Sequence, residues 1–358
     1  MLFRSFSSDT SGAPPKTFLS IARFGITNAD VFVVDSAWLD SHRDYDTSKG
    51  IHFRNLHLSN LNLLLSGKID KTTYEATIQN FFCEIDSPHF ALKSFSGKFF
   101  ASPSQIRTDG VDLQTEFSKI SLSSRIDGVN IFSPFSFDTI SHKHLDFSFY
   151  SPVVSLDELV LFFPSLSPLS GSAFLELNTA GEIGNLAIST LHAEAFESSV
   201  NLSGMLRALP NKDSLFLDAN ISDAAFSFAE VSSGIPQLYL PSLPGLGQIH
   251  FSGKLAASPH SCNADLLTTS NAGQIKTNTL LDWSNPELQY QSNFSAHSFS
   301  LQSVLQKESD NEVFPQTSLN IHGHVSGKGT SLGNIVSTAS ISIDSSSVLW
   351  SKIGRAHV

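Results

Sequence analysis

The segment SLDELVLFFPSLSPLSG (Ser155–Gly171) places a short apolar stretch and a run of prolines between two β-strand patterns. Apolar residues alternate with polar ones from Leu145 to Phe149, and the alternation resumes at Ala173. Proline has no N–H group to continue a helix, so the segment predicts a short helix over Leu156–Phe163 that ends before the next strand.

The order of strand, proline-rich loop and strand returns twice along the chain. Successive copies start roughly 70 to 75 residues apart, a near-constant period that is typical of an array of similar supersecondary units. The repeated prolines are Pro164, Pro241 and Pro315, and the strands that open each copy start at Leu145, Leu215 and Leu288.

This period predicts the organisation of the chain. We expect a disordered segment or linker at 1–18, a first β section at 19–144, β repeats at 145–214, 215–287 and 288–352, the last of them incomplete, and a non-native tail at 353–358. The tail IGRAHV resembles the translation of a common sequencing adapter, so we expect the natural chain to continue past Trp350.

Period-two alternation dominates the remaining sequence, and Val111–Val129 carries it most clearly. One face of each pattern is apolar, and the other holds Ser, Thr, Asn, Gln, Asp or His, as in an antiparallel sheet with one wet face. The predicted fold is all-β: a long, twisted, mostly antiparallel sheet curled into an open groove, with a few short helices. At roughly 12 residues per strand and turn, we expect nearly 30 strands. We predict a turn at Asn28 and a turn or bulge at Asn60.

Composition excludes several classes of protein. The 358 residues are 41% hydrophobic and only 15% charged, and the net charge of −11 argues against a nucleic-acid partner. No apolar run approaches the ~20 residues of a membrane-spanning helix, and Met1–Lys16 lacks the apolar core of a signal peptide. Cys83 and Cys262 are predicted to be isolated thiols.

Residues 323–330, GHVSGKGT, superficially match a phosphate-binding loop. The glycine spacing is one residue short, and Gly329 stands where Ser or Thr would hold magnesium. Ser-Gly-Lys also begins at Ser66, Ser96 and Ser252, so we interpret it as a repeated strand position where glycine permits a bend or close approach.

Other candidate chemistry is equally weak. His142/His144 and His322/His324 have i,i+2 spacing, which places each pair on one face of a strand, but no third ligand recurs nearby. We interpret them as solvated strand positions. Asp157-Glu158 is expected to offset the dipole at the start of the short helix. We predict no enzyme, no cofactor and no metal site.

The apolar stripe itself is the candidate site. Its side chains would fill a dry core if two sheets packed face to face, or would line an accessible trough if one sheet stayed open. Because the pattern continues with short turns and few linkers, we favour the trough. The predicted lining residues are Leu113, Phe117, Leu122, Phe135, Phe137, Phe147, Phe149, Leu175, Leu202, Leu217, Phe226, Phe228, Phe251, Leu319, Ile321 and Ile341.

The spaced pattern resembles the TamB and AsmA-like family of bacterial envelope proteins over about residues 19–350. The similarity lies in Leu156–Gly171, in SSVNLSG at Ser198–Gly204, in IHFSGKLA from Ile249 and in NIHGHVSGKGTSL from Asn320. The similarity also includes the segments FALKSFSGKF from Phe90 and VDLQT from Val111.

The resemblance implies a repeating β-groove protein that conducts phospholipid between the inner and outer membranes and supports outer-membrane biogenesis. It implies a periplasmic location, acyl chains as ligand, an inner-membrane anchor and an outer-membrane barrel partner. Two alternatives remain open. One is an assembly or secretion factor for outer-membrane proteins that acts by strand-edge pairing, and the other is a structural or adhesive β-solenoid.

Overall fold

The computed structural model consists almost entirely of antiparallel strands. It describes residues 19–35, 50–130, 137–166, 170–227, 244–285, 287–305, 315–329 and 335–349. The chain divides into unit 1, residues 1–184, and unit 2, residues 185–358. Described residues form seventeen strands, fewer than the nearly 30 expected, because most strands are longer than a strand-plus-turn repeat of 12 residues allows.

Unit 1 is a meander in which each strand pairs antiparallel with the next one in sequence. A short helix, α2 (Phe137–Ile140), precedes β7, and α3 (Leu156–Phe162) and the 3-10 turn η2 (Pro164–Leu166) follow it. The strands are β1 (Leu19–Val34), β2 (Asn55–Ile69), β3 (Tyr74–Ile85), β4 (Phe90–Ser102), β5 (Gln105–Thr115), β6 (Lys119–Asp127), β7 (His144–Ser155) and β8 (Ser172–Glu182).

Unit 2 repeats this arrangement with nine strands. Its short elements are η3 (Lys212–Ser214), η5 (Pro244–Leu246) and α5 (Leu301–Leu305). The strands are β9 (Asn185–Ala195), β10 (Ser198–Arg207), β11 (Phe216–Ser227), β12 (Gln248–Ala257), β13 (Ser261–Ser270), β14 (Gly273–Asp282), β15 (Gln289–Phe299), β16 (Gln316–Lys328) and β17 (Val336–Leu349).

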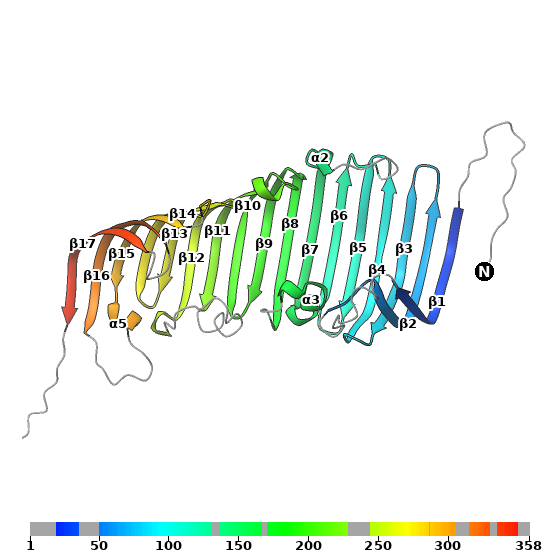
Figure 1. Cartoon of the computed structure of the whole chain (residues 1–358), viewed down its shortest axis with the longest axis horizontal. Coiled ribbons are helices and arrows are strands. Elements are labelled where there is room, and N and C mark those ends of the chain that lie inside the picture. The colour runs from blue at the N-terminus through cyan, green and yellow to red at the C-terminus, as the bar shows by residue number, and fades with distance from the viewer. Residues whose placement is uncertain are drawn as a thin grey trace, which may run out of the picture. The chain divides into compact units, whose positions relative to one another are not determined.

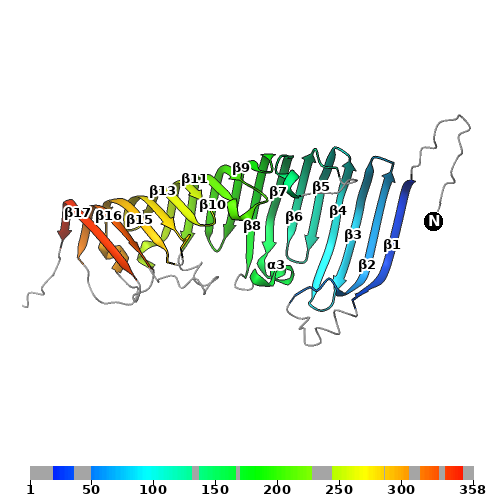
Figure 2. The same cartoon turned by 45° about the horizontal axis from the view of Figure 1, so that its top comes forward.

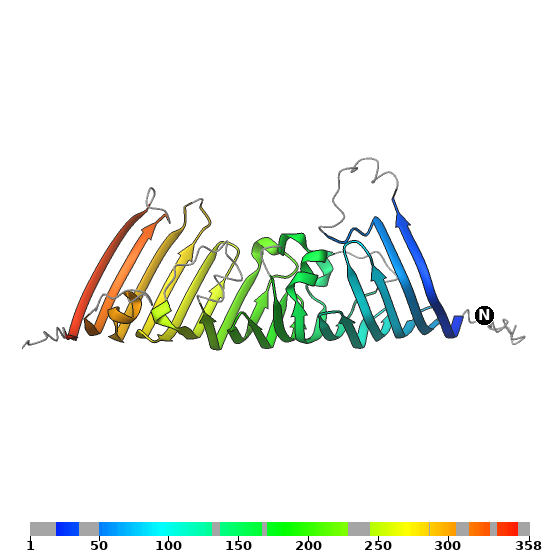
Figure 3. The same ribbon diagram turned by 90° about the horizontal axis from the view of Figure 1, so that it is seen from below.

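The predicted fold class is confirmed. The protein is all-β, its pairings are antiparallel, and the sheet is open and not closed into a barrel. The strands twist and curl within each unit (Figures 2 and 3). The described helices are short, and none is long and apolar enough to span a membrane.

Alternate connections of a meander lie at the same end of its strands. In unit 1 the β1–β2, β3–β4, β5–β6 and β7–β8 connections therefore share one edge, which also holds α3 and is called the α3 edge below. Figure 1 shows α3 at the lower ends of the unit 1 strands and α2 at the upper ends. The predicted helix at Leu156–Phe163 is confirmed as α3, which starts at the expected residue.

Bulges keep the apolar side chains on one face. Asn60 has a φ of 52°, and the pairing of β2 with β3 shifts there, so the predicted bulge is confirmed. The turn predicted at Asn28 is wrong: Asn28, with a φ of 47°, lies within β1. The register with β2 shifts between Ile26 and Ala29, and the backbone N–H of Asn28 donates to Asn62 Oδ1 at 3.1 Å. Its left-handed conformation therefore makes a bulge instead of a turn.

The Ser-Gly-Lys positions are strand residues where backbones approach closely, as the repeat predicted. A Cβ atom on Gly67 would lie 2.8 Å from Glu75 O, one on Gly253 2.1 Å from Asp265 O, and one on Gly327 2.5 Å from Val336 O. The apparent phosphate loop, up to Lys328, is strand β16.

Replacing Gly253 with alanine should destabilise unit 2. Its φ is +140° and the added Cβ would meet a backbone oxygen, so we expect a loss of about 1–3 kcal/mol and a lower melting temperature by circular dichroism. Gly25→Ala is the matched control, because its Cβ would meet its nearest neighbour at 3.8 Å. Equal melting temperatures for the two variants would contradict this explanation.

Candidate functional site: the apolar faces

One face of the unit 1 sheet is a continuous apolar surface. Residues that pair across strands point to the same face, so the registers identify its members. One row of paired residues crosses six strands, and a second row crosses the other end of the unit. The first is Ile26, Leu63, Phe81, Phe95, Leu113 and Ile120, and the second is Val111, Leu122, Phe149 and Leu177.

Unit 2 has an equivalent face. Two rows of paired residues each cross all nine strands, and they contain small, apolar and hydroxyl side chains. The first is Leu191, Leu202, Ile221, Gly253, Leu266, Thr277, Phe294, Gly323 and Ile341, and the second is Ala193, Val200, Ala224, Phe251, Thr268, Ile275, Ala296, Ile321 and Ile343.

Charge is absent from these rows. None of the residues paired on either apolar face in the described strands is Asp, Glu, Lys or Arg. Hydroxyl groups on the faces bond to one another: Thr108 and Ser124 at 2.9 Å, and Thr279 and Ser292 at 2.8 Å. Paired hydroxyls satisfy each other without water, so they interrupt the apolar surface little.

No second sheet covers these faces in the described part of the chain. The strands pack mainly against their neighbours in sequence, α3 lies against the ends of β4, β5, β7 and β8, and α5 lies on β16. The centre of the unit 1 face is a cluster of Leu61, Cys83 and Leu92, but most surrounding side chains are only half-buried. The apolar faces are therefore partly open to solvent.

Most of the predicted lining residues lie on these faces. In unit 1 they are Leu113, Leu122, Phe147, Phe149 and Leu175, and in unit 2 they are Leu202, Leu217, Phe226, Phe251, Leu319, Ile321 and Ile341. Leu319 is buried and Ile341 is exposed, whereas the rest are half-buried.

Two of the predicted residues lie off these faces, and two lie outside the described residues. Phe117 follows the end of β5 in a turn and is 61% exposed, because β5 stops two residues earlier at Thr115. Phe137 starts α2 and is not in a strand. Phe135 and Phe228 lie outside the described residues.

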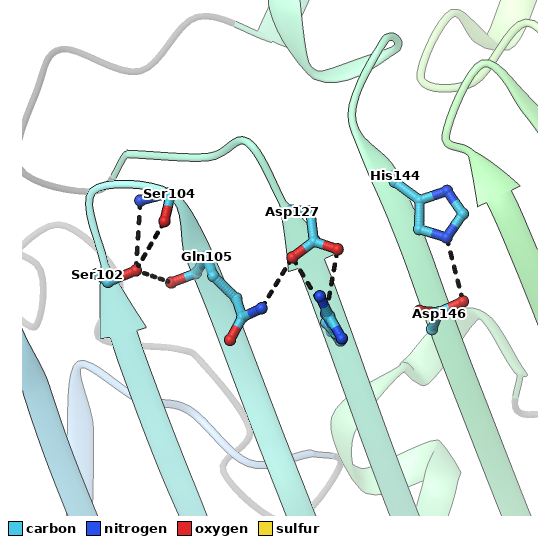
Figure 4. A network of polar contacts seen from close by, with 7 residues as sticks. Ser102, Ser104, Gln105, Asp127, His144 and Asp146 are labelled. Atoms are coloured by element: carbon cyan, nitrogen blue, oxygen red, sulfur yellow. Dashed lines mark hydrogen bonds and ion pairs between the residues drawn. The ribbon is translucent and has the colours of Figure 1, made fainter.

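The opposite face is polar and carries ion pairs between neighbouring side chains. Asp127 accepts hydrogen bonds from Gln105 Nε2 at 2.8 Å and from Arg125, and these bonds lower the pKa of its carboxyl group (Figure 4). His144 lies 3.3 Å from Asp146 on the same face. The histidines of the predicted i,i+2 pairs that lie in strands are thus on the polar face, and no cluster of three metal ligands occurs among the described residues.

Glu158 anchors α3 at the end of the unit 1 apolar face, a role that its sequence neighbours did not reveal. It is 8% exposed, and its carboxylate accepts hydrogen bonds from the hydroxyls of Thr115 and Ser118 and from the backbone N–H of Phe117. Ser155 caps the helix by accepting from Glu158 N at 3.2 Å. Three donors therefore stabilise a buried carboxylate without a cation.

Neighbouring segments fix the other end of α3. Ile51 donates its backbone N–H to Leu161 O at 2.7 Å, and the Phe162 ring meets Phe90 edge-to-face at 5.1 Å between centroids. Phe90 packs against the central cluster of the apolar face. The helix thus covers only one end of that face, at the α3 edge.

Comparison with known proteins found no matching family model, no matching curated protein and no matching solved structure.

Replacing Glu158 with alanine should loosen α3. The Thr115 and Ser118 hydroxyls and the Phe117 N–H would lose their common acceptor, so we expect a loss of about 1–3 kcal/mol and faster amide exchange in Leu156–Phe162. Hydrogen exchange with mass spectrometry measures this. Asp157→Asn, at an exposed neighbour that keeps an acceptor oxygen for Gly171 N, should raise exchange much less than Glu158→Ala does. Equal protection in the Glu158→Ala variant would contradict the anchoring role.

Cys262 reports on the unit 2 apolar face, where it pairs with Ala257 and Leu281. Burial raises the pKa of its thiol and that of Cys83, so thiolate forms only at higher pH than in the unfolded chain. The folded state favours the neutral thiol, so this contribution to stability is present at neutral pH and is lost as pH rises through the raised pKa.

We expect iodoacetamide to alkylate both cysteines more slowly in the folded chain than in urea, with Cys83, which is 5% exposed, reacting more slowly than Cys262. Peptide mass spectrometry at several pH values measures the rates. Alkylation of Cys262 at the unfolded rate would show that this face is not packed as described.

Proposed function

We propose that the chain is part of a TamB- or AsmA-like envelope protein whose apolar faces conduct phospholipid acyl chains between the inner and outer membranes, in support of outer-membrane biogenesis. One observation carries the proposal: each unit has a charge-free apolar face that crosses its strands with no second sheet over it in the described residues. A dry core would require a second layer there.

The physical requirement for lipid transfer is modest. Each methylene moved from hydrocarbon into water costs about 0.8 kcal/mol, so a two-chain lipid faces a barrier on the order of 20 kcal/mol in an aqueous gap. A half-exposed surface of Phe, Leu, Ile and Val lowers that barrier without a catalytic group. The phosphate headgroup can remain in solvent, and we propose no enzyme activity and no cofactor.

The topology argues against the β-solenoid alternative. A β-solenoid stacks parallel strands from successive coils. Every pairing in the described residues is instead antiparallel, between strands that are neighbours in sequence.

The strand-pairing alternative requires a sheet edge that no other strand of the protein occupies. Unprotected edges accept further strands. A strand-pairing factor would bind an extended peptide and would carry no stoichiometric phospholipid, whereas a lipid conduit would carry it. Mass spectrometry of the purified chain separates the two functions.

Charged substitutions on the unit 2 face should abolish lipid binding while the sheet still forms. We expect Leu202→Asp and Phe251→Glu each to reduce co-purified phospholipid and lipid transfer between vesicles by roughly tenfold or more, since a charge against acyl chains costs about 3 kcal/mol. Mass spectrometry of lipid extracts and a fluorescent-lipid transfer assay measure the two effects.

Ser203→Asp and Ser252→Glu are the matched controls. Each adds the same charge one residue along the same strand, on the polar face, and should leave lipid content within about twofold of the parent. Unimpaired transfer by both apolar-face variants would refute the proposed function.

A further inference from the structure

Exposed phenylalanines gather at the α3 edge of unit 1. Phe53 is 65% exposed, Phe117 61%, Phe163 58% and Phe162 36%. They lie in the β1–β2, β5–β6 and β7–β8 connections, where loops are ordinarily polar. These four residues are called the phenylalanine rim below.

Contacts with α3 bring the segments of the rim together. The backbone N–H of Phe117 lies 3.2 Å from Glu158 Oε1, and Phe162 and Phe163 end the helix. Phe53 follows Gly50 and Ile51, which contact Leu161. The rim is thus held by backbone and buried hydrogen bonds while its rings remain exposed.

We propose that the phenylalanine rim docks on a lipid surface, inserting its rings among the acyl chains of a zwitterionic leaflet. A phenylalanine ring has no hydroxyl or N–H group with which to hydrogen-bond a protein partner, as Tyr and Trp have. Large exposed apolar patches mark protein or membrane contacts, and aromatic and aliphatic side chains are those that enter the acyl boundary.

Charge at this edge favours a zwitterionic surface. Asp35 lies 3.8 Å from Arg54, and Glu116 precedes Phe117, so the described charges beside the rim include both signs and the arginine is already paired. Paired charges give little long-range attraction to anionic lipid. Docking should therefore depend on apolar area and respond weakly to salt.

The rim is continuous with the apolar face of unit 1. The Phe162 ring contacts Phe90, which packs against Leu61, Cys83 and Leu92. An acyl chain leaving the leaflet at the rim would meet the apolar face directly. This second step rests on the proposed function, whereas docking does not.

Flotation with phosphatidylcholine vesicles tests the docking, using the whole 358-residue chain. Removing the Phe117 and Phe163 rings in a Phe117→Ser/Phe163→Ser variant should lower the partition coefficient about 10- to 100-fold, because each ring loses its contact with hydrocarbon. Raising salt from 50 to 500 mM should change parental binding less than about twofold. Both residues are exposed, so melting temperature should hardly change.

A Leu267→Ser/Leu280→Ser variant is the matched control. These leucines are 39% and 46% exposed on the polar face of unit 2, and their loss should leave flotation unchanged. Docking is overturned if the rim variant floats as the parent does, or if high salt releases the parent. It is also overturned if the parent does not float but self-associates through the rim, measured by light scattering.

The same assay separates this proposal from the proposed function. Leu202→Asp should float normally while carrying no phospholipid. A parent chain that floats through its rim but carries no lipid would overturn the conduit and support docking. A parent chain that carries lipid but floats independently of the rim would overturn docking and support the conduit.

Discussion

The separation of apolar and polar side chains onto opposite faces of each antiparallel sheet is the constraint on which the structure depends. A strand that slips by one residue moves every apolar side chain to the wet face. The sequence spacing is not strictly two, since Leu58 and Leu61 are three residues apart, yet both pair with β1 residues on the apolar face. The bulge at Asn60 absorbs the extra residue. Bulges are thus what make a continuous face compatible with an irregular sequence.

Small and polar residues on the apolar faces follow from the same constraint. Phe294 packs its ring over Gly323, where a Cβ atom would lie 2.3 Å from the ring. A glycine opposite an aromatic residue lets the ring lie flat across the neighbouring strand. Thr108 and Ser124 satisfy each other's hydroxyls across strands. Neither feature introduces an unpaired polar group. Each apolar face therefore excludes water where its side chains touch and stays accessible to solvent between them.

Local periodicity predicted the fold class, the apolar rows and the start of α3, because all three depend on side chains close in sequence. It failed where a residue's environment is set by distant segments. Phe117 continues the alternation of β5, but the strand ends at Thr115 to form the turn that bonds Glu158. The sequence predicts only a helix-dipole role for Glu158, because its hydrogen-bond partners, Thr115 and Ser118, lie about 40 residues away. Asn28 is predicted to form a turn because asparagine adopts the left-handed conformation both in turns and in bulges.

The two helices that contact strands are held by different physics. Both helices have close backbone contacts, Ile51 N–H with Leu161 O at α3 and Gly245 against Ser303 O at α5, but α3 adds three donors to a buried carboxylate. A buried carboxylate depends on each of its donors, because losing one leaves charge that is neither hydrogen-bonded nor hydrated. Helix α3, which is bordered by exposed phenylalanines, is therefore fixed in place by buried hydrogen bonds. A hydrogen-bonded anchor thus lies where the apolar face of unit 1 meets the rim.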